Sequence, residues 1–223
     1  MVRIRLHGVG WRAEEGTAKL LSELPWQRLR RPRTLSAEQV AKDNRLRTVA
    51  RLDHPRDPEL PGFYVKRYKF NRNKDRLKHL AHPGRLRHEW KLGRLLLQES
   101  IPTPRPVARG ESYDGMLIDE AYLISREIPN SMPLKEWVRR TQEDGSGRLS
   151  AATVEKVGRL AADLANRGLH HVDFHADNIL VQERPDGELD LYVMDLHSLR
   201  RRRLTRRRVR SMLAMLANSS HLT

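Results

Sequence analysis

The chain has 223 residues, 32% of them charged and none of them cysteine, with a formal net charge of +15. These totals allow one domain or two small lobes around a cleft, exclude disulfides and thiolate metal sites, and predict an anionic partner such as nucleic acid, an acidic membrane surface or a phosphorylated substrate. No apolar run is long enough for a signal peptide or for a bilayer span of roughly 20 residues, so we expect a soluble or peripheral protein of the cytoplasm.

The pattern of the first half predicts several strands and one long helix. Alternating apolar and other residues indicate the strands, and leucines near the helical period indicate the helix, which ends before a run of three prolines at 102–106. Strands are expected at 2–6, 46–52, 63–68, 116–118 and 122–124. Helices are expected at 17–26 and 85–99.

The second half is predicted to be more helical and to hold a polar loop. A short helix over 134–140 is followed by a second helix, which Ser150 caps and Gly168 ends. A polar loop follows, then two strands joined by a turn at 185–187. A composition boundary near 126–133 divides the chain into an N-lobe, residues 1–127, and a C-lobe, residues 128–223.

Three polar residues have the spacing of a kinase catalytic loop and its metal-binding aspartate. Asp173 is followed five residues later by Asn178, and Asp195 comes after the predicted hairpin. In this hypothesis Asp173 orients the attacking hydroxyl and accepts its proton, while Asn178 and Asp195 hold Mg²⁺ through hard oxygen atoms. The plain alternative is that Asp173 and Asn178 only cap turns and that His171 is a core histidine; the joint pattern favours the kinase hypothesis.

A kinase also needs a cation on the ATP phosphates, usually a strand lysine paired with a helix glutamate. Lys66 lies in an apolar and aromatic strand, and Glu89 lies on the helix that follows, so we expect this pair to serve; Glu99, at the helix end, is a poorer candidate. The alternative is two ordinary surface charges. No glycine-rich loop of the usual form occurs, and the glycines at 8 and 10 are weak evidence for one.

Two further features leave alternatives open. His175 could place a positive charge near the transferred phosphoryl group, or it could be an ordinary loop histidine; its spacing from the other histidines does not favour a zinc site. The arginine tract at 200–210 could be a solvated basic segment, a basic amphipathic helix with residues 212–216 on an acidic lipid surface, or a nucleic-acid contact.

The motifs together resemble the lipopolysaccharide core kinases of the Kdo/WaaP type. The similarity covers roughly residues 46–220. One departure from protein kinases is Leu-His after Asp195 in place of Phe-Gly, which is similar to this family. The segments that carry the resemblance are FYVKRY at 63–68, Glu89, IPTPRPVARGE at 101–111, HVDFHADNIL at 171–180 and VMDLH at 193–197.

The resemblance implies an α+β, two-lobed protein-kinase-like fold that uses ATP and Mg²⁺. Only 28 residues follow Asp195, so the C-lobe is expected to be minimal unless the chain is truncated. By the resemblance Asp173 is the catalytic aspartate, Asn178 and Asp195 are the metal ligands, and Lys66 is the ATP lysine. The implied acceptor is a sugar hydroxyl of the lipopolysaccharide inner core, an anionic glycolipid, with peripheral contact at the inner membrane.

Three rival functions stay open from the sequence. The first is a kinase of protein serine or threonine, and the second is an aminoglycoside-type kinase, for which an acidic acceptor pocket is expected rather than a basic chain. The third is a non-catalytic basic scaffold that binds membrane or nucleic acid; nucleic acid is the less favoured partner.

Overall fold

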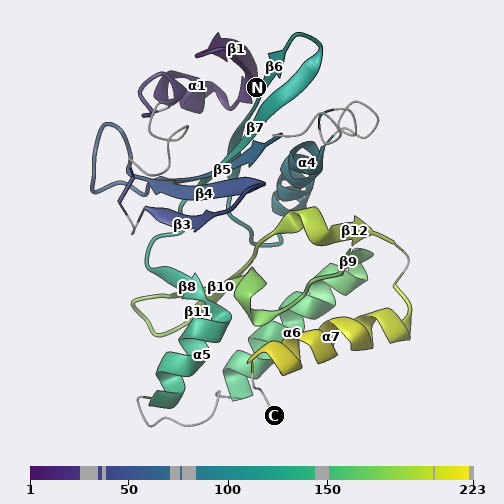
Figure 1. The fold of residues 1–223 in the computed structure, drawn as a ribbon. Helices are drawn as coiled ribbons and strands as arrows, with labels where there is room; N and C mark the ends of the chain where they lie inside the picture. The colour runs from purple at the N-terminus through teal and green to yellow at the C-terminus, as the bar shows by residue number, and fades with distance from the viewer. Residues whose placement is uncertain are drawn as a thin grey trace. The chain divides into compact units, whose positions relative to one another are not determined.

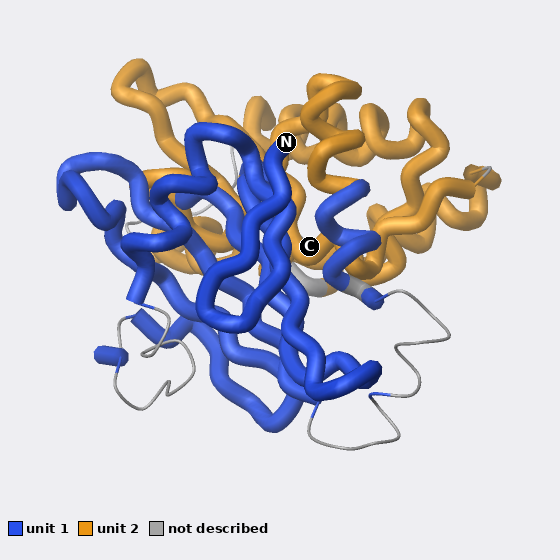
Figure 2. The backbone as a smooth tube through the Cα atoms, turned by 90° about the horizontal axis from the view of Figure 1, so that it is seen from above, with its two compact units in different colours: residues 1–91, 105–127 blue, residues 92–104, 128–223 orange. Residues whose placement is uncertain are grey.

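The computed structural model describes residues 1–25, 35–36, 39–70, 76, 84–143, 151–202 and 204–220. The chain forms two compact units (Figure 2). Unit 1 comprises residues 1–91 and 105–127, and unit 2 comprises residues 92–104 and 128–223.

The segment 92–104 belongs to unit 2, whereas the sequence-based division placed it in the first lobe. The reason is burial: Leu92, Leu96 and Ile101 are part of the hydrophobic core of unit 2. Sequence patterns could show that these residues are apolar but not which of two cores receives them.

Unit 1 is built on a seven-stranded antiparallel sheet with the order β1-β2-β6-β7-β5-β4-β3 (Figure 1). The helices α1 (Glu15–Leu21) and α4 (Arg85–Gln98) begin in this unit. The strands are β1 (Val2–Leu6), β2 (Val9–Ala13), β3 (Val40–Asp43), β4 (Arg47–Leu52), β5 (Phe63–Lys69), β6 (Pro106–Asp114) and β7 (Leu117–Arg126).

The central strand β7 separates the two hydrophobic clusters of unit 1. Side chains alternate across a strand, so Tyr122 and Ile124 belong to one cluster while Ala121 and Leu123 belong to the other. The first half of α4 covers the second cluster with Leu86. One cluster therefore packs between the sheet and α4.

Several expected elements of unit 1 are confirmed, and others differ in extent. The hairpin of 46–52 with 63–68 is present as β4 and β5. The two short strands expected at 116–118 and 122–124 are one long strand, β7, and the helix expected at 17–26 ends at Leu21 as α1; residue 26 lies outside the described residues. Strand β6 was not predicted at its full length. Glycine is required at position 110 of this strand, since a Cβ there would lie 2.6 Å from the Trp11 ring.

Within the described residues, unit 2 combines three helices of its own with two small sheets (Figure 1). The helices are α5 (Leu134–Glu143), α6 (Ala151–Asn166) and α7 (Arg206–Ser220). The sheets have the orders β11-β10-β8 and β12-β9. Their strands are β8 (Ser131–Pro133), β9 (Leu169–His171), β10 (Ile179–Glu183), β11 (Leu189–Val193) and β12 (Leu199–Arg201), with single 3-10 turns η2 (Ala176–Asn178) and η3 (Leu196–Ser198). The predicted cap Ser150 lies outside the described residues.

The C-terminal segment does not form the lipid-facing amphipathic helix that was one of the three open alternatives for the arginine tract. The arginine tract is divided between β12 and α7 rather than forming one helix. Met212 and Leu216 are only 2% and 3% exposed, because they are part of the core of unit 2. The apolar stripe of α7 therefore stabilises the unit and is not available to lipid. Within the described residues, no helix combines the length and apolarity that a bilayer crossing requires.

Candidate active site

The part of the site in unit 1 is an ion pair between a strand and a helix. Lys66 lies on β5, opposite Leu123 of β7, and Glu89 lies on α4 beside the residues that pack on β7. Lys66 Nζ lies 2.5 Å from Glu89 Oε1, and the glutamate is buried. Burial strengthens such a pair and fixes the position of the ammonium group. The two residues that the sequence predicted as partners are thus in direct contact.

The part in unit 2 begins with the loop between β9 and β10. Asn178, on η2, donates through Nδ2 to the Asp173 main-chain oxygen at 2.9 Å and to Asp173 Oδ2 at 3.3 Å. Asn178 is buried, whereas 47% of the Asp173 side chain is exposed. The buried Asn178 side chain therefore fixes the position of Asp173, while the Asp173 carboxylate stays accessible to a substrate hydroxyl.

His175 lies between two carboxylates of the same loop. Its Nε2 is 3.3 Å from Asp173 Oδ1 and 3.2 Å from Asn178 Nδ2, and its Nδ1 is 3.6 Å from Asp177 Oδ2. The predicted residue is therefore in contact with the predicted catalytic aspartate.

Asp195 comes to the same end of the β10–β11 hairpin as Asn178. The Met194 amide donates to the Asn178 main-chain oxygen at 2.8 Å, just beyond the last strand pair. Asp195 has a left-handed backbone with φ of 52°. Aspartate tolerates this conformation better than most residues, and here it turns the chain sharply from β11 into η3.

Two histidines support Asp195 and its neighbour. His197 Nδ1 lies 2.9 Å from Asp195 Oδ1, a contact that fixes the carboxylate. The sequence did not predict this contact, although the Asp-x-His spacing was an available signal.

His171 is fully buried, and its Nε2 lies 3.1 Å from the Met194 main-chain oxygen. A carbonyl oxygen only accepts, so Nε2 carries the proton. Burial lowers the pKa of His171, although the bond to Met194 raises it in part. His171 is a core histidine, as in the plain alternative, and it also holds the strand end before Asp195.

The oxygen atoms at this hairpin end fit a hard cation. Asn178 Nδ2 donates to two oxygen atoms of Asp173 and lies beside His175 Nε2, so Nδ2 faces the loop and the amide Oδ1 is left for a ligand. Mg²⁺ at nucleotide sites takes one or two protein oxygens together with phosphate and water. Asn178 and Asp195 could supply two such oxygens. Within the described residues no group of three or more His, Cys, Asp or Glu side chains forms a metal cage.

The hairpin that precedes the lysine strand β5 is β3–β4. The sequence analysis did not identify its turn as a candidate for the phosphate-binding loop. Asn44 Oδ1 accepts from the amides of Leu46 at 2.9 Å and Arg47 at 2.8 Å, which closes the turn without glycine. The glycine turn at 7–10 joins β1 to β2, and β2, β6 and β7 lie between β1 and the lysine strand β5. In kinases the loop over the phosphates belongs to the hairpin that precedes the lysine strand. The turn at 44–46 therefore occupies that position.

The chain matches the model of the lipopolysaccharide kinase (Kdo/WaaP) family over residues 32–222. It belongs to this family. The matched span contains all six residues predicted for the site, which are Lys66, Glu89, Asp173, His175, Asn178 and Asp195.

Individual relatives and a solved structure agree with this membership. The lipopolysaccharide core heptose(I) kinase WaaP of Pseudomonas aeruginosa is 28% identical over 132 residues, which are 56% of this chain and 48% of the relative. A 3-deoxy-D-manno-octulosonic acid kinase of Xanthomonas axonopodis is 33% identical over 136 residues, 59% of this chain and 51% of the relative. A solved WaaP in complex with acyl carrier protein has a TM-score of 0.63 at 23% identity and covers 94% of this chain and 80% of that one.

More distant solved kinases also match the chain, so the fold is protein-kinase-like. This confirms the α+β kinase fold expected from the sequence. The chain spans about half the length of the curated relatives it matches.

Proposed function

We propose that the protein is a kinase that transfers the γ-phosphoryl group of ATP to a hydroxyl group of a lipopolysaccharide inner-core sugar. The observation that carries the proposal is the arrangement of Asp173, Asn178 and Asp195 at one end of a single hairpin, in a chain of this family. Phosphoryl transfer depends mainly on positioning and on neutralising charge. Asp173 would position the hydroxyl, and Asn178 and Asp195 would hold the cation that neutralises the phosphates.

In the proposed reaction each residue of unit 2 has one role. Asp173 accepts a hydrogen bond from the acceptor hydroxyl, aligns it with the γ-phosphorus atom and takes its proton as the new phosphate ester forms. ADP leaves with the bridging oxygen. Asn178 Oδ1 and Asp195 hold Mg²⁺, which supplies positive charge to the phosphates. His175 lies beside Asp173, next to the position proposed for the transferred group.

In unit 1, Lys66 binds the ATP phosphates and Glu89 keeps its ammonium group in place. The ion pair described above supports this assignment. We also assign the turn at 44–46 to the loop that covers the phosphates, the position that a glycine-rich turn occupies in other kinases. The Arg45 side chain, on that turn, adds positive charge.

The acceptor class follows from the family and from the charge of the chain. The relatives named above phosphorylate, by their names, a heptose or 3-deoxy-D-manno-octulosonic acid, so the proposal names the inner-core sugar without choosing between them. The net charge of +15 suits a phosphorylated glycolipid. We propose a cytoplasmic protein that works at the inner-membrane surface, where such an acceptor would be presented.

Purified protein incubated with radiolabelled ATP, Mg²⁺ and three acceptors tests the proposal. Core glycolipid should become labelled, whereas label on protein serine or threonine, or on an aminoglycoside, would favour a rival kinase. A basic scaffold would neither bind Mg-ATP nor transfer label, and this result would overturn the proposal.

Asp173→Ala should lower kcat by about 10²- to 10⁴-fold, because this range is the usual contribution of a positioned general base. The folded state should be kept, since half of the Asp173 side chain is exposed. Asp163→Ala is the matched control, because this exposed carboxylate lies on α6 and pairs only locally with Arg167. Equal activity of the Asp173 variant and wild type would contradict the assigned role.

A further inference from the structure

The first half of α4 makes a second polar contact, on the side away from Lys66. Arg87 Nε lies 2.6 Å from Glu111 Oε1, and Arg87 Nη2 lies 2.5 Å from Glu111 Oε2. The guanidinium therefore donates two hydrogen bonds to the carboxylate. Glu111 lies on β6, and the Tyr113 hydroxyl donates to its Oε2 at 2.8 Å. Arg109 approaches Oε1 at 3.3 Å. Four side chains thus build a polar cluster at one flank of the helix.

The titration of this cluster agrees with a strong charge pair. Burial alone would raise the pKa of Glu111, yet the hydrogen bonds from Arg87 and Tyr113 lower it overall. The pKa of Arg87 is raised, chiefly by its bonds to Glu111. The pair therefore stays ionised and bidentate, a geometry that restricts orientation more than a single bond does.

The order of contacts around α4 matches the order of strands below it. A helix turns about 100° per residue, so Leu86 and Trp90 form one stripe, with Arg87 on one flank and Glu89 on the other. The stripe packs on β7, while Arg87 reaches β6 and Glu89 reaches β5. The sheet order is β6-β7-β5, so each flank of the helix is bonded to the strand on its own side.

We propose that Arg87 and Glu111 are positioning residues that fix the rotation of α4 about its axis and thereby hold Glu89 on Lys66. Hydrophobic packing of Leu86 on β7 has no preferred direction, so by itself it permits the helix to roll. Two directional contacts on opposite flanks prevent that roll. The consequence for ATP binding rests on the proposed function, but the effect on α4 does not.

Unit 1 contains a closely matched control pair. Arg51 Nε lies 2.6 Å from Glu127 Oε1, and its Nη2 lies 3.1 Å from Oε2. The side-chain exposures are 37% for the arginine and 13% for the glutamate in both pairs. The control pair joins β4 to the end of β7 and does not involve α4. Any general cost of breaking a bidentate pair of this exposure therefore appears in both.

The first experiment compares Arg87→Met with Arg51→Met, and Glu111→Gln with Glu127→Gln. We expect the variants at 87 and 111 to raise the KM for ATP and to lower kcat/KM by about 10- to 100-fold, because displacement of a catalytic group by about 1 Å costs up to that factor. The KM for the acceptor should not change. The control variants should stay within about twofold of wild type in both constants. Equal losses in the two pairs would overturn the proposal.

The second experiment tests whether Glu111 acts through Glu89. In a Glu89→Gln background, Glu111→Gln should have no further effect on the KM for ATP, because the contact that it positions is already lost. Multiplicative effects of the two substitutions would show independent roles and would contradict the proposal. Thermal unfolding of every variant identifies any that fail to fold. If Arg87→Met fails to fold, Arg87→Lys replaces it, because lysine keeps the positive charge but cannot form the two-bond contact of a guanidinium.

Hydrogen exchange of the protein without nucleotide separates failure of this inference from failure of the proposed function. Glu111→Gln should accelerate amide exchange in the first half of α4, and Glu127→Gln should not. If wild-type protein transfers no phosphate but shows this difference, the proposed function fails and the positioning role stands. Unchanged exchange in Glu111→Gln, with an active wild type, would refute the positioning role alone.

Discussion

At the scale of single residues, the candidate site depends on which atoms are already engaged within the loop. Asn178 directs Nδ2 to Asp173, so only its amide oxygen is left for a cation. Asp195 presents its carboxylate from a left-handed backbone, and His197 contacts one of its oxygens. These contacts fix the two side chains whose oxygen atoms are proposed to hold the cation.

The buried His171 gives a prediction about pH at the same scale. Burial lowers its pKa in the folded protein from the usual 6.5, so the unfolded chain binds a proton at a higher pH than the folded one. The resulting stability is fully present above about pH 6.5 and is lost progressively as the pH falls below that value. His171→Gln keeps a donor for the Met194 carbonyl but cannot bind a proton. It should therefore weaken the pH dependence of stability.

Urea unfolding at about pH 7.5 and about pH 5.5 measures the effect, as the difference between the two midpoints. The difference should be smaller for His171→Gln than for wild type. His54→Gln, in unit 1, is the control and should leave it unchanged. An identical shift for wild type and the His171 variant would contradict a buried, neutral histidine at this position.

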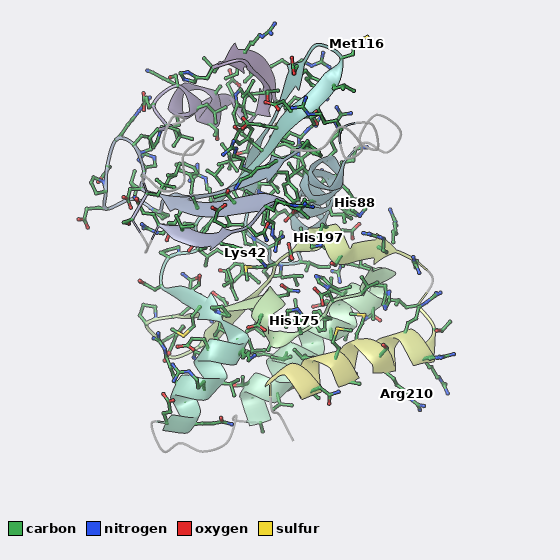
Figure 3. All side chains as sticks on the ribbon, viewed as in Figure 1. Lys42, His88, Met116, His175, His197 and Arg210 are labelled. Carbon is green, nitrogen blue, oxygen red and sulfur yellow. The ribbon has the colours of Figure 1, made fainter. Side chains whose placement is uncertain are left out.

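At the scale of elements, α7 shows how a basic segment can also be a core helix. Arg206, Arg207 and Arg210 are exposed, while Met212 and Leu216 are part of the core of unit 2. Arg210 points away from the body of unit 2 (Figure 3). The helix therefore has a buried face that stabilises the unit and a basic face that is open to solvent.

Met212→Ala should lower the free energy of unfolding by about 2–5 kcal/mol, the usual cost of removing a buried side chain of this size. Leu213→Ala is the matched control on the same helix, because Leu213 is 41% exposed, and it should cost less than about 1 kcal/mol. Urea midpoints of both variants give the comparison. If α7 lay apart from the core, the two substitutions would have the same small effect.

At the scale of the whole molecule, the charge is unevenly distributed along the chain. No aspartate or glutamate follows Asp195, although the same segment contains the arginine tract. The exposed arginines of this segment are therefore not neutralised by acidic residues nearby in the sequence. This supports the proposed contact with an acidic lipid surface, now through the arginine face of α7 rather than through its apolar stripe.

Replacing Arg206, Arg207 and Arg210 together by glutamine should weaken binding to vesicles with anionic lipid by about 100-fold, since each basic residue near such a surface contributes about 1 kcal/mol. Co-sedimentation at low and high salt provides the measurement, and binding should fall with salt. The control replaces three exposed arginines of unit 1, Arg3, Arg5 and Arg12, for the same change in net charge.

Equal loss in both triple variants would mean that total charge, not the α7 face, drives binding. A preference of wild type for RNA or for an acidic protein over the vesicles would assign the arginine face to that partner and contradict the membrane contact.

The sequence by itself determined the features that depend on short stretches of chain. Asp173 and Asn178 are five residues apart in one loop, and a tight hairpin returns the chain to Asn178 just before Asp195, so local geometry alone brings them together. The strand that contains Lys66 and the helix that contains Glu89 were likewise predicted from the spacing of apolar residues and from local composition.

Only the tertiary structure decided which surface receives each apolar stripe. Residues 92–104 joined unit 2 through Leu92, and Met212 of α7 turned to the core rather than to lipid. The contact of Arg87 with Glu111 also depends on the order of strands in the sheet. The physical reason is that hydrophobic burial has no direction: a sequence shows that a stripe must be covered, and long-range packing alone determines what covers it.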